Sequence, residues 1–166
     1  GADLCIGDLM FAVGLPFAIR SWAAFQFLAA VLLPVVVKLP VKFLYPTGDK
    51  QEAVTPRGAH WYEWADVIAG DFHLIRRHMP DDLTGKGILT NTTTEKDHEE
   101  LRKRGVKTLI TTTPVINGRS FGTNVMEGVL FTAAGKRPEQ MSPDDYLAML
   151  GRLGWEPNVE ELQSPS

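Results

Sequence analysis

The stretch GILTNTTTEKDHEELRKRGVKTLITTTP, residues 87–114, decides the fold class of this chain. Gly87–Thr90 is a short apolar run typical of a strand, and Lys107–Ile110 is a second one. Between them, Glu95–Arg104 predicts a helix, because Thr94 is a good N-cap, acidic residues come early, basic residues come late and a glycine follows. A strand, a helix and a strand in so short a stretch predict a right-handed parallel crossover.

Two further strands are expected upstream of this stretch. Leu4–Ile6 is a short apolar run that ends in Gly7-Asp8, and Asp66–Ala69 is a second one that ends in Gly70-Asp71. The sequence therefore predicts an α/β protein with a mostly parallel, Rossmann-like sheet flanked by helices. The first strand and the glycine loop of a complete Rossmann fold are not visible in it, since nothing matches G-x-G-x-x-G.

The remaining helices are predicted from caps and apolar spacing. We expect one Rossmann-like domain over residues 1–162, with a frayed tail over residues 163–166. The expected helices are a short one within Arg57–Glu63, then Phe72–His78, Val125–Ala134 with Thr123 or Asn124 as N-cap, and Pro143–Leu153 with Ser142 as N-cap.

The composition is that of a globular protein and excludes several classes. Hydrophobic residues make up 44% of the 166 residues and charged residues 22%, which argues against disorder. The net charge of −3 argues against a general positive field for nucleic acid. One cysteine, Cys5, rules out an intrachain disulfide and a Cys-rich zinc site, so we expect a buried, inert thiol in a cytoplasmic protein.

The chain opens with Gly1-Ala2-Asp3 and no Met, from which we expect a processed or truncated chain. Residues 23–37 are apolar apart from one glutamine, but Pro34, Lys38 and Pro40 interrupt the wider run. A membrane span needs about 20 apolar residues, so we favour a buried helix pair with no membrane partner. This pair would also serve as a homo-oligomer interface over residues 23–44.

The chemistry is expected where the predicted strands end. All four strands end in small or polar residues, and in open parallel sheets ligands bind beyond the carboxyl ends of the strands. Threonine and asparagine suit ribose or phosphate, although they also cap the helices that follow. The predicted cofactor-binding residues at two of these ends are Asn91, Thr92, Thr93, Thr111, Thr112 and Thr113.

Two other residues are candidates for cofactor contacts. Asp8, at the end of the first predicted strand, would accept hydrogen bonds from an adenosine ribose, which favours NAD over NADP; as an alternative it caps the following segment. Arg119 precedes Gly122 and a predicted helix, so it could bind an anion together with the N-terminus of that helix. The alternative is that it lies in an exposed loop. Lys50 is a weaker candidate in a turn.

Asp71 and His73 are the candidate catalytic pair, because they lie just beyond a strand end and His titrates near neutral pH. His98, in the charged helix, is expected to be a solvated residue. The spacing of the four histidines matches no metal signature, so no metal site is predicted. No nucleophile elbow, P-loop or basic-aromatic stripe is present, which argues against the common hydrolase, NTPase and RNA-binding classes.

Five segments together resemble one family of bacterial proteins. They are Gly7–Leu9, Leu44–Gly48, Ala65–His73, Thr90–Thr94 and Arg119–Glu127, and they resemble the carboxyl-terminal half of proteins labelled quinate 5-dehydrogenase. The resemblance implies a Rossmann-type domain, a nicotinamide cofactor and a small-molecule substrate. It also implies that the catalytic Lys and Asp of shikimate and quinate dehydrogenases belong to a part upstream of this chain, so no residue here inherits those roles.

Four functions therefore stand as hypotheses. The first is an NAD(P)-dependent oxidoreductase that moves a hydride to or from a cyclic polyol such as quinate. The second is a non-catalytic nucleotide- or metabolite-binding module that uses the same crevice. The third is a transferase that uses S-adenosylmethionine, whose ribose Asp8 would also suit. The last is a membrane-associated scaffold that uses residues 23–44.

Overall fold

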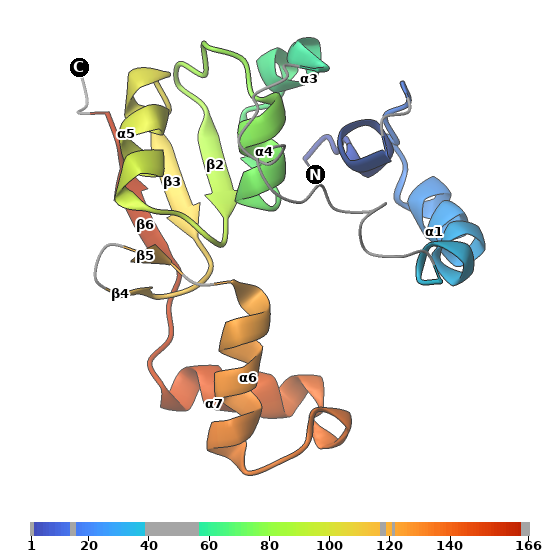
Figure 1. The fold of residues 1–166 in the computed structure, drawn as a ribbon, viewed down its shortest axis with the longest axis vertical. Helices are drawn as coiled ribbons and strands as arrows, with labels where there is room; N and C mark the ends of the chain where they lie inside the picture. The colour runs from blue at the N-terminus through green and yellow to red at the C-terminus, as the bar shows by residue number, and fades with distance from the viewer. Residues whose placement is uncertain (1, 14–15, 39–56, 117–118, 121, 164–166) are drawn as a thin grey trace. The chain divides into compact units, whose positions relative to one another are not determined.

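The computed structural model describes residues 2–13, 16–38, 57–116, 119–120 and 122–163 (Figure 1). The chain divides into two compact units. The first comprises Gly1–Trp64 and His73–Pro80, and the second comprises Ala65–Phe72 and Asp81–Ser166. We expected one domain over residues 1–162, whereas the structure has these two units.

The second unit contains an open four-stranded sheet with the order β1-β2-β3-β6. β1 (Val67–Ala69), β2 (Gly87–Thr90) and β3 (Thr108–Thr111) are parallel, with Ile68 opposite Ile88 and Ile88 opposite Leu109. β6 (Asn158–Glu161) runs antiparallel to β3. The α/β fold class with a mostly parallel, Rossmann-like sheet is thus confirmed.

The crossover from β2 to β3 follows the local signals in its sequence. Its helix α5 (Glu95–Lys103) starts at Thr94, whose backbone N–H and hydroxyl both donate to the Asp97 carboxylate, at 2.9 and 2.7 Å. This capping box provides hydrogen-bond partners at the start of the helix, as predicted from Thr94. Leu101 on α5 is fully buried, as are Ile88, Val106 and Leu109, and these four side chains form the centre of the core.

The segment after β3 forms a hairpin and then a helical pair. β4 (Val115–Ile116) and β5 (Arg119–Ser120) are antiparallel, and α6 (Thr123–Ala134) packs on α7 (Pro143–Arg152), as Figure 1 shows. A short 3-10 turn, Pro138–Gln140, lies between these helices. Ser142 caps α7 as predicted. The pKa of Asp145 is lowered to about 2, mainly by a hydrogen bond from Lys136 and to a smaller extent by hydrogen bonds from Ser142. α6 starts earlier than predicted, with Gly122 as its N-cap.

The strands in the structure differ from the predicted ones. Leu4–Ile6 is not a strand of the sheet: Ile6 forms an isolated antiparallel bridge with Ile19, both in the first unit. An apolar run this short carries no signal that separates a strand from other buried backbone. β6 was not predicted, because Asn158–Glu161 has one apolar residue among three polar ones.

The first unit is helical, and the half-buried Phe11 contacts two of its helices. Its elements are the π-helical turn η1 (Leu9–Val13), α1 (Trp22–Val36), α3 (Ala59–Trp64) and most of α4 (Phe72–His78). The Phe11 ring meets Tyr62 edge-on at 5.5 Å and His78 at 5.4 Å, and His78 Nε2 lies 3.1 Å from the Phe11 carbonyl. α3 and α4 match the two helices predicted there.

The apolar amino-terminal region bears on two expectations, one for the Cys5 thiol and one for the apolar helix. Cys5 is half-buried, and burial raises its thiol pKa against the opposing charge of Arg20, which fits an unreactive thiol. We expected a buried helix pair, and that prediction is wrong for α1: none of its residues is buried, and Phe27, Leu33 and Val35 are exposed. Among the described residues no helix is both long enough and apolar enough to cross a membrane. The oligomer interface over residues 23–44 stays a prediction, and residues 39–44 lie outside the described residues.

Gly105 ends the crossover helix in a left-handed conformation, with φ of +83°, and a Cβ there would lie 2.6 Å from Thr84 Oγ1 and 3.0 Å from Thr84 Cα. Gly135, after α6, has φ of +66° and open space around it. We expect Gly135→Ala to cost about 1–2 kcal/mol of unfolding free energy from backbone conformation, and Gly105→Ala to cost roughly 3 kcal/mol because it adds overpacking. Urea unfolding measures both, and equal losses contradict the close approach.

Candidate functional site

The three parallel strands end at one edge of the sheet. β1 runs into Gly70 and Asp71, and Thr90 at the end of β2 lies opposite Thr111 at the end of β3. The structure therefore brings the predicted residues after β2 and β3 together, as expected for carboxyl ends of parallel strands.

Hydrogen bonds join the three strand ends to one another. The Thr90 hydroxyl donates to the Gly70 carbonyl at 2.7 Å, and the Thr112 backbone N–H donates to the Thr90 carbonyl at 2.9 Å. The Thr113 hydroxyl donates to the Asn91 carbonyl at 3.1 Å. These threonines thus satisfy backbone groups that the end of the sheet would otherwise leave without partners.

A buried polar network lies behind this edge. His98 Nε2 lies 3.1 Å from Thr93 Oγ1, and His98 Nδ1 lies 3.0 Å from Glu160 Oε2 on β6. Thr93 Oγ1 lies 3.0 Å from Ser120 Oγ, and the Ser120 hydroxyl donates to the Asn91 carbonyl. His98 was expected to be solvated, and that prediction is wrong: the residue is 5% exposed because β6 brings Glu160 to it.

The network has the composition of a nucleophile site but not its accessibility. A hydroxyl, an imidazole and a carboxylate in sequence are the groups that activate a serine or threonine nucleophile. Thr93 is 1% exposed and Ser120 is 4% exposed, so neither oxygen can meet a substrate. The network therefore stabilises the fold and joins α5, β5 and β6 to the loop after β2.

The predicted cofactor-binding residues divide by accessibility. Thr112 is exposed, and Asn91 and Thr92 are half-buried. Asn91 donates to Thr123 Oγ1 at 3.3 Å and accepts from the Thr92 backbone N–H at 2.6 Å. The other three, Thr93, Thr111 and Thr113, are buried.

Thr111 differs from its neighbours, because its buried Oγ1 has no hydrogen-bond partner within the part of the chain that the structure describes. Arg119 lies on the two-residue strand β5, next to Ser120 of the buried network. Accessible polar groups at this edge are thus provided by Asn91, Thr92 and Thr112 together with the end of β1.

The other predicted residues lie at different places. Asp71 is half-buried directly before α4, and His73 is exposed in the first turn of that helix. Asp8 is exposed beside η1 in the first unit, so the strand-end argument for it is wrong, because no sheet strand ends there. Lys50 lies outside the described residues.

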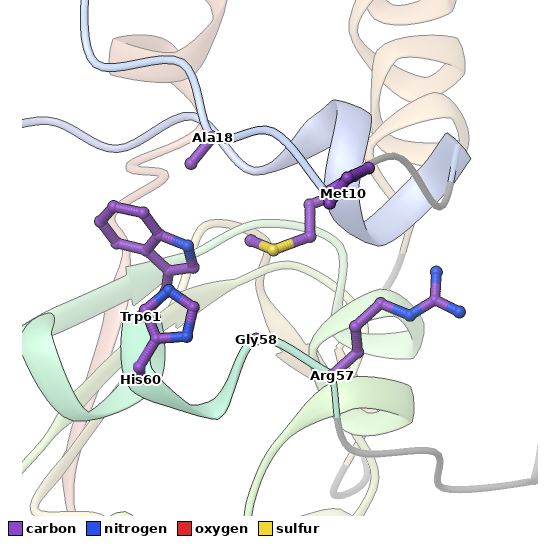
Figure 2. Close-up of a pocket in the computed structure, with 7 residues that line it drawn as sticks. Met10, Ala18, Arg57, Gly58, His60 and Trp61 are labelled. Atoms are coloured by element: carbon purple, nitrogen blue, oxygen red, sulfur yellow. The ribbon is translucent and has the colours of Figure 1, made fainter.

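A second candidate site is a hollow in the first unit, which we call the Arg57–Trp61 hollow. Its volume is about 440 Å³, and Figure 2 shows the Met10 side chain between Trp61 and Arg57. Its lining residues come from η1, from the segment before α1, and from the two residues before α3 and the first turn of that helix. They are Met10, Pro16, Ala18, Arg57, Gly58, His60 and Trp61.

Sequence reasoning missed this hollow, because its two sides are far apart in the chain. The cluster of Arg57, His60 and Trp61 within five positions was the available signal. Among the described residues, no group of three or more histidine, cysteine or acidic side chains is placed to hold a metal ion.

The comparison with protein families matches residues 1–162 to one described as Domain of unknown function (DUF8754). The chain belongs to this family. No curated protein and no solved structure matches the chain. Because the match covers residues of both units, the DUF8754 domain includes the strand-end site and the Arg57–Trp61 hollow alike.

The buried network around His98 should contribute to the stability of the DUF8754 chain. We expect His98→Ala to lower the free energy of unfolding by roughly 2–4 kcal/mol, because it leaves a cavity and removes two hydrogen-bond partners. Glu99→Ala, an exposed position on the same helix, is the matched control and should change it by less than about 0.5 kcal/mol. Denaturant unfolding compares the two, and a similar small loss in both contradicts the assigned role of His98.

Proposed function

We propose that this chain provides the nucleotide-binding α/β unit of an NAD(P)-dependent oxidoreductase that moves a hydride to or from a cyclic polyol such as quinate. One observation carries the proposal: three parallel strands end at a single edge with small or polar groups, several of them accessible. Open parallel sheets bind their ligands at this edge. The cytoplasm remains the expected compartment.

The order of the strands supports one part of the edge as the proposed dinucleotide site. β1, β2 and β3 follow one another in sequence order, so the order does not reverse among them. In Rossmann sheets the ligand lies beside the point where the order reverses. Within the described residues β1 pairs on one side only, so the proposed site lies toward β1 and includes Gly70, Asp71 and Asn91.

The proposed role of each residue follows from which of its polar groups a ligand at the strand ends could contact. The amide of Asn91 and the hydroxyls of Thr92 and Thr112 would bind ribose or phosphate oxygens at the edge. Asp71 and His73 would transfer the proton that accompanies the hydride. The cofactor itself supplies the hydride chemistry, and the chain positions it.

A non-catalytic binding module is the second candidate, and the buried network favours it. His98, Thr93 and Ser120 have the chemistry of acid–base catalysis, but they are buried and bonded to one another. A ligand at the edge would then meet mostly neutral hydrogen-bonding groups, which bind without promoting a reaction.

Binding is tested by titrating the chain calorimetrically with NAD, NADP and S-adenosylmethionine. We expect Asn91→Asp to weaken dinucleotide binding by about tenfold or more, because it keeps the shape of the side chain and places a negative charge beside the phosphates. Lys107→Gln makes the same change in net charge at the opposite end of β3 and should leave binding unchanged. No binding of either dinucleotide overturns the proposal, and binding of S-adenosylmethionine in their place indicates a transferase.

Catalysis is tested by following reduced nicotinamide during oxidation of quinate or shikimate. We expect Asp71→Asn and His73→Gln to lower kcat by about 10²- to 10⁴-fold while the dissociation constant for NAD stays within about twofold, because the two residues move a proton rather than hold the cofactor. A chain that binds NAD but turns over neither substrate is instead a binding module.

A further inference from the structure

We propose that the Arg57–Trp61 hollow is a second binding site, which takes a small planar molecule carrying a carboxylate. The hollow lies wholly in the first unit, whereas the carboxyl ends of β1, β2 and β3 belong to the second. This inference therefore goes beyond the proposed oxidoreductase function and does not depend on it.

Met10 forms the floor of the hollow, and glycine at position 58 is what admits it. Gly58 has φ of +64°, and a Cβ there would lie 2.8 Å from the Met10 sulfur. Met10 lines the hollow, although only 5% of its surface is exposed. A thioether packs well against aromatic rings, which suits a flat apolar ligand.

The floor is held in place by contacts on its far side. Phe11 follows Met10 and packs against Tyr62 of α3 and His78 of α4. Tyr62 is 4% exposed and its hydroxyl donates to the Ile75 carbonyl at 3.3 Å. η1 is thus fixed to the helix that carries Trp61, and a fixed hollow binds without the cost of ordering it first.

Trp61 supplies the flat wall. Its ring lies 4.9 Å from the His60 ring at 44° and meets Trp64 edge-on at 5.8 Å. Figure 2 shows the indole of Trp61 across the hollow from the arginine, with Met10 between them. An aromatic ligand placed against the indole would gain the offset stacking that such pairs prefer.

The charge of the hollow selects an anion. Among the described residues that line it, Arg57 carries a permanent positive charge and none is acidic. A guanidinium binds a carboxylate through two parallel hydrogen bonds, which favours a carboxylate over a neutral polar group.

The size of the hollow limits the ligand to one or two rings. Its volume of about 440 Å³ is at the lower end of the range of roughly 300–1,000 Å³ for small-molecule sites. A two-ring aromatic carboxylate fits this volume, with its rings against the Met10 thioether and the Trp61 indole and its carboxylate on the Arg57 guanidinium.

The test uses 2-naphthoate and its neutral counterpart 2-naphthamide as probes, followed by tryptophan fluorescence and calorimetry. We expect naphthoate to bind the chain, and Arg57→Gln to weaken that binding by about tenfold or more while hardly changing the weak binding of naphthamide. Trp61→Leu should weaken both probes, because it removes the flat wall.

Arg20→Gln is the matched control, since it removes an exposed arginine of the same unit that does not line the hollow. It should leave naphthoate affinity within about twofold. The proposal is overturned if naphthoate does not bind at millimolar concentration, or if Arg20→Gln and Arg57→Gln weaken it equally. Addition of NAD distinguishes the two sites, because naphthoate should still bind whether or not the dinucleotide does.

Discussion

The contact between Glu160 and His98 holds together the part of the α/β unit that lies behind the strand ends. One carboxylate oxygen of Glu160, on β6, contacts the His98 imidazole, and the other binds Arg102 on α5. The second ring nitrogen of His98 contacts the Thr93 hydroxyl. An unpaired polar group buried at this depth would cost about 1–3 kcal/mol, so each member of the network needs the others. A strand from the end of the chain, a helix and two loops are thereby fixed to one another.

This network also decides what the edge of the sheet can do. The loop after β2 is tied through Thr93 and the Asn91 carbonyl to Ser120, while the loop after β3 is tied to the Asn91 carbonyl through Thr113. Loops held in this way keep their outward side chains in fixed positions, which favours binding of a rigid ligand. The same bonds occupy the hydroxyls that a catalytic role would need, so selectivity at this edge depends on the few groups left accessible.

Local signals made the crossover predictable, and long-range pairing made the rest unpredictable. The strands and the helix of residues 87–111 follow from apolar runs, the Thr94 cap and a terminal glycine, all of which act within a few residues. The burial of His98 depends on Glu160, which no local pattern places beside it. The Arg57–Trp61 hollow was missed for the same reason, since Met10 and Trp61 meet only after the chain has folded. The expected strand at Leu4–Ile6 failed because an apolar tripeptide is equally compatible with a single bridge.

The two candidate sites differ in the physics by which they would bind. At the strand ends the accessible groups are neutral amides and hydroxyls, whose individual hydrogen bonds contribute about 0.5–1.5 kcal/mol each, so affinity there requires many of them and a ligand as large as a dinucleotide. In the Arg57–Trp61 hollow one guanidinium, one indole and one thioether face a small volume, so a compact ligand can gain a charged contact and apolar burial together. The two proposals therefore assign different kinds of ligand to the two surfaces, and they predict that one chain binds both molecules at once.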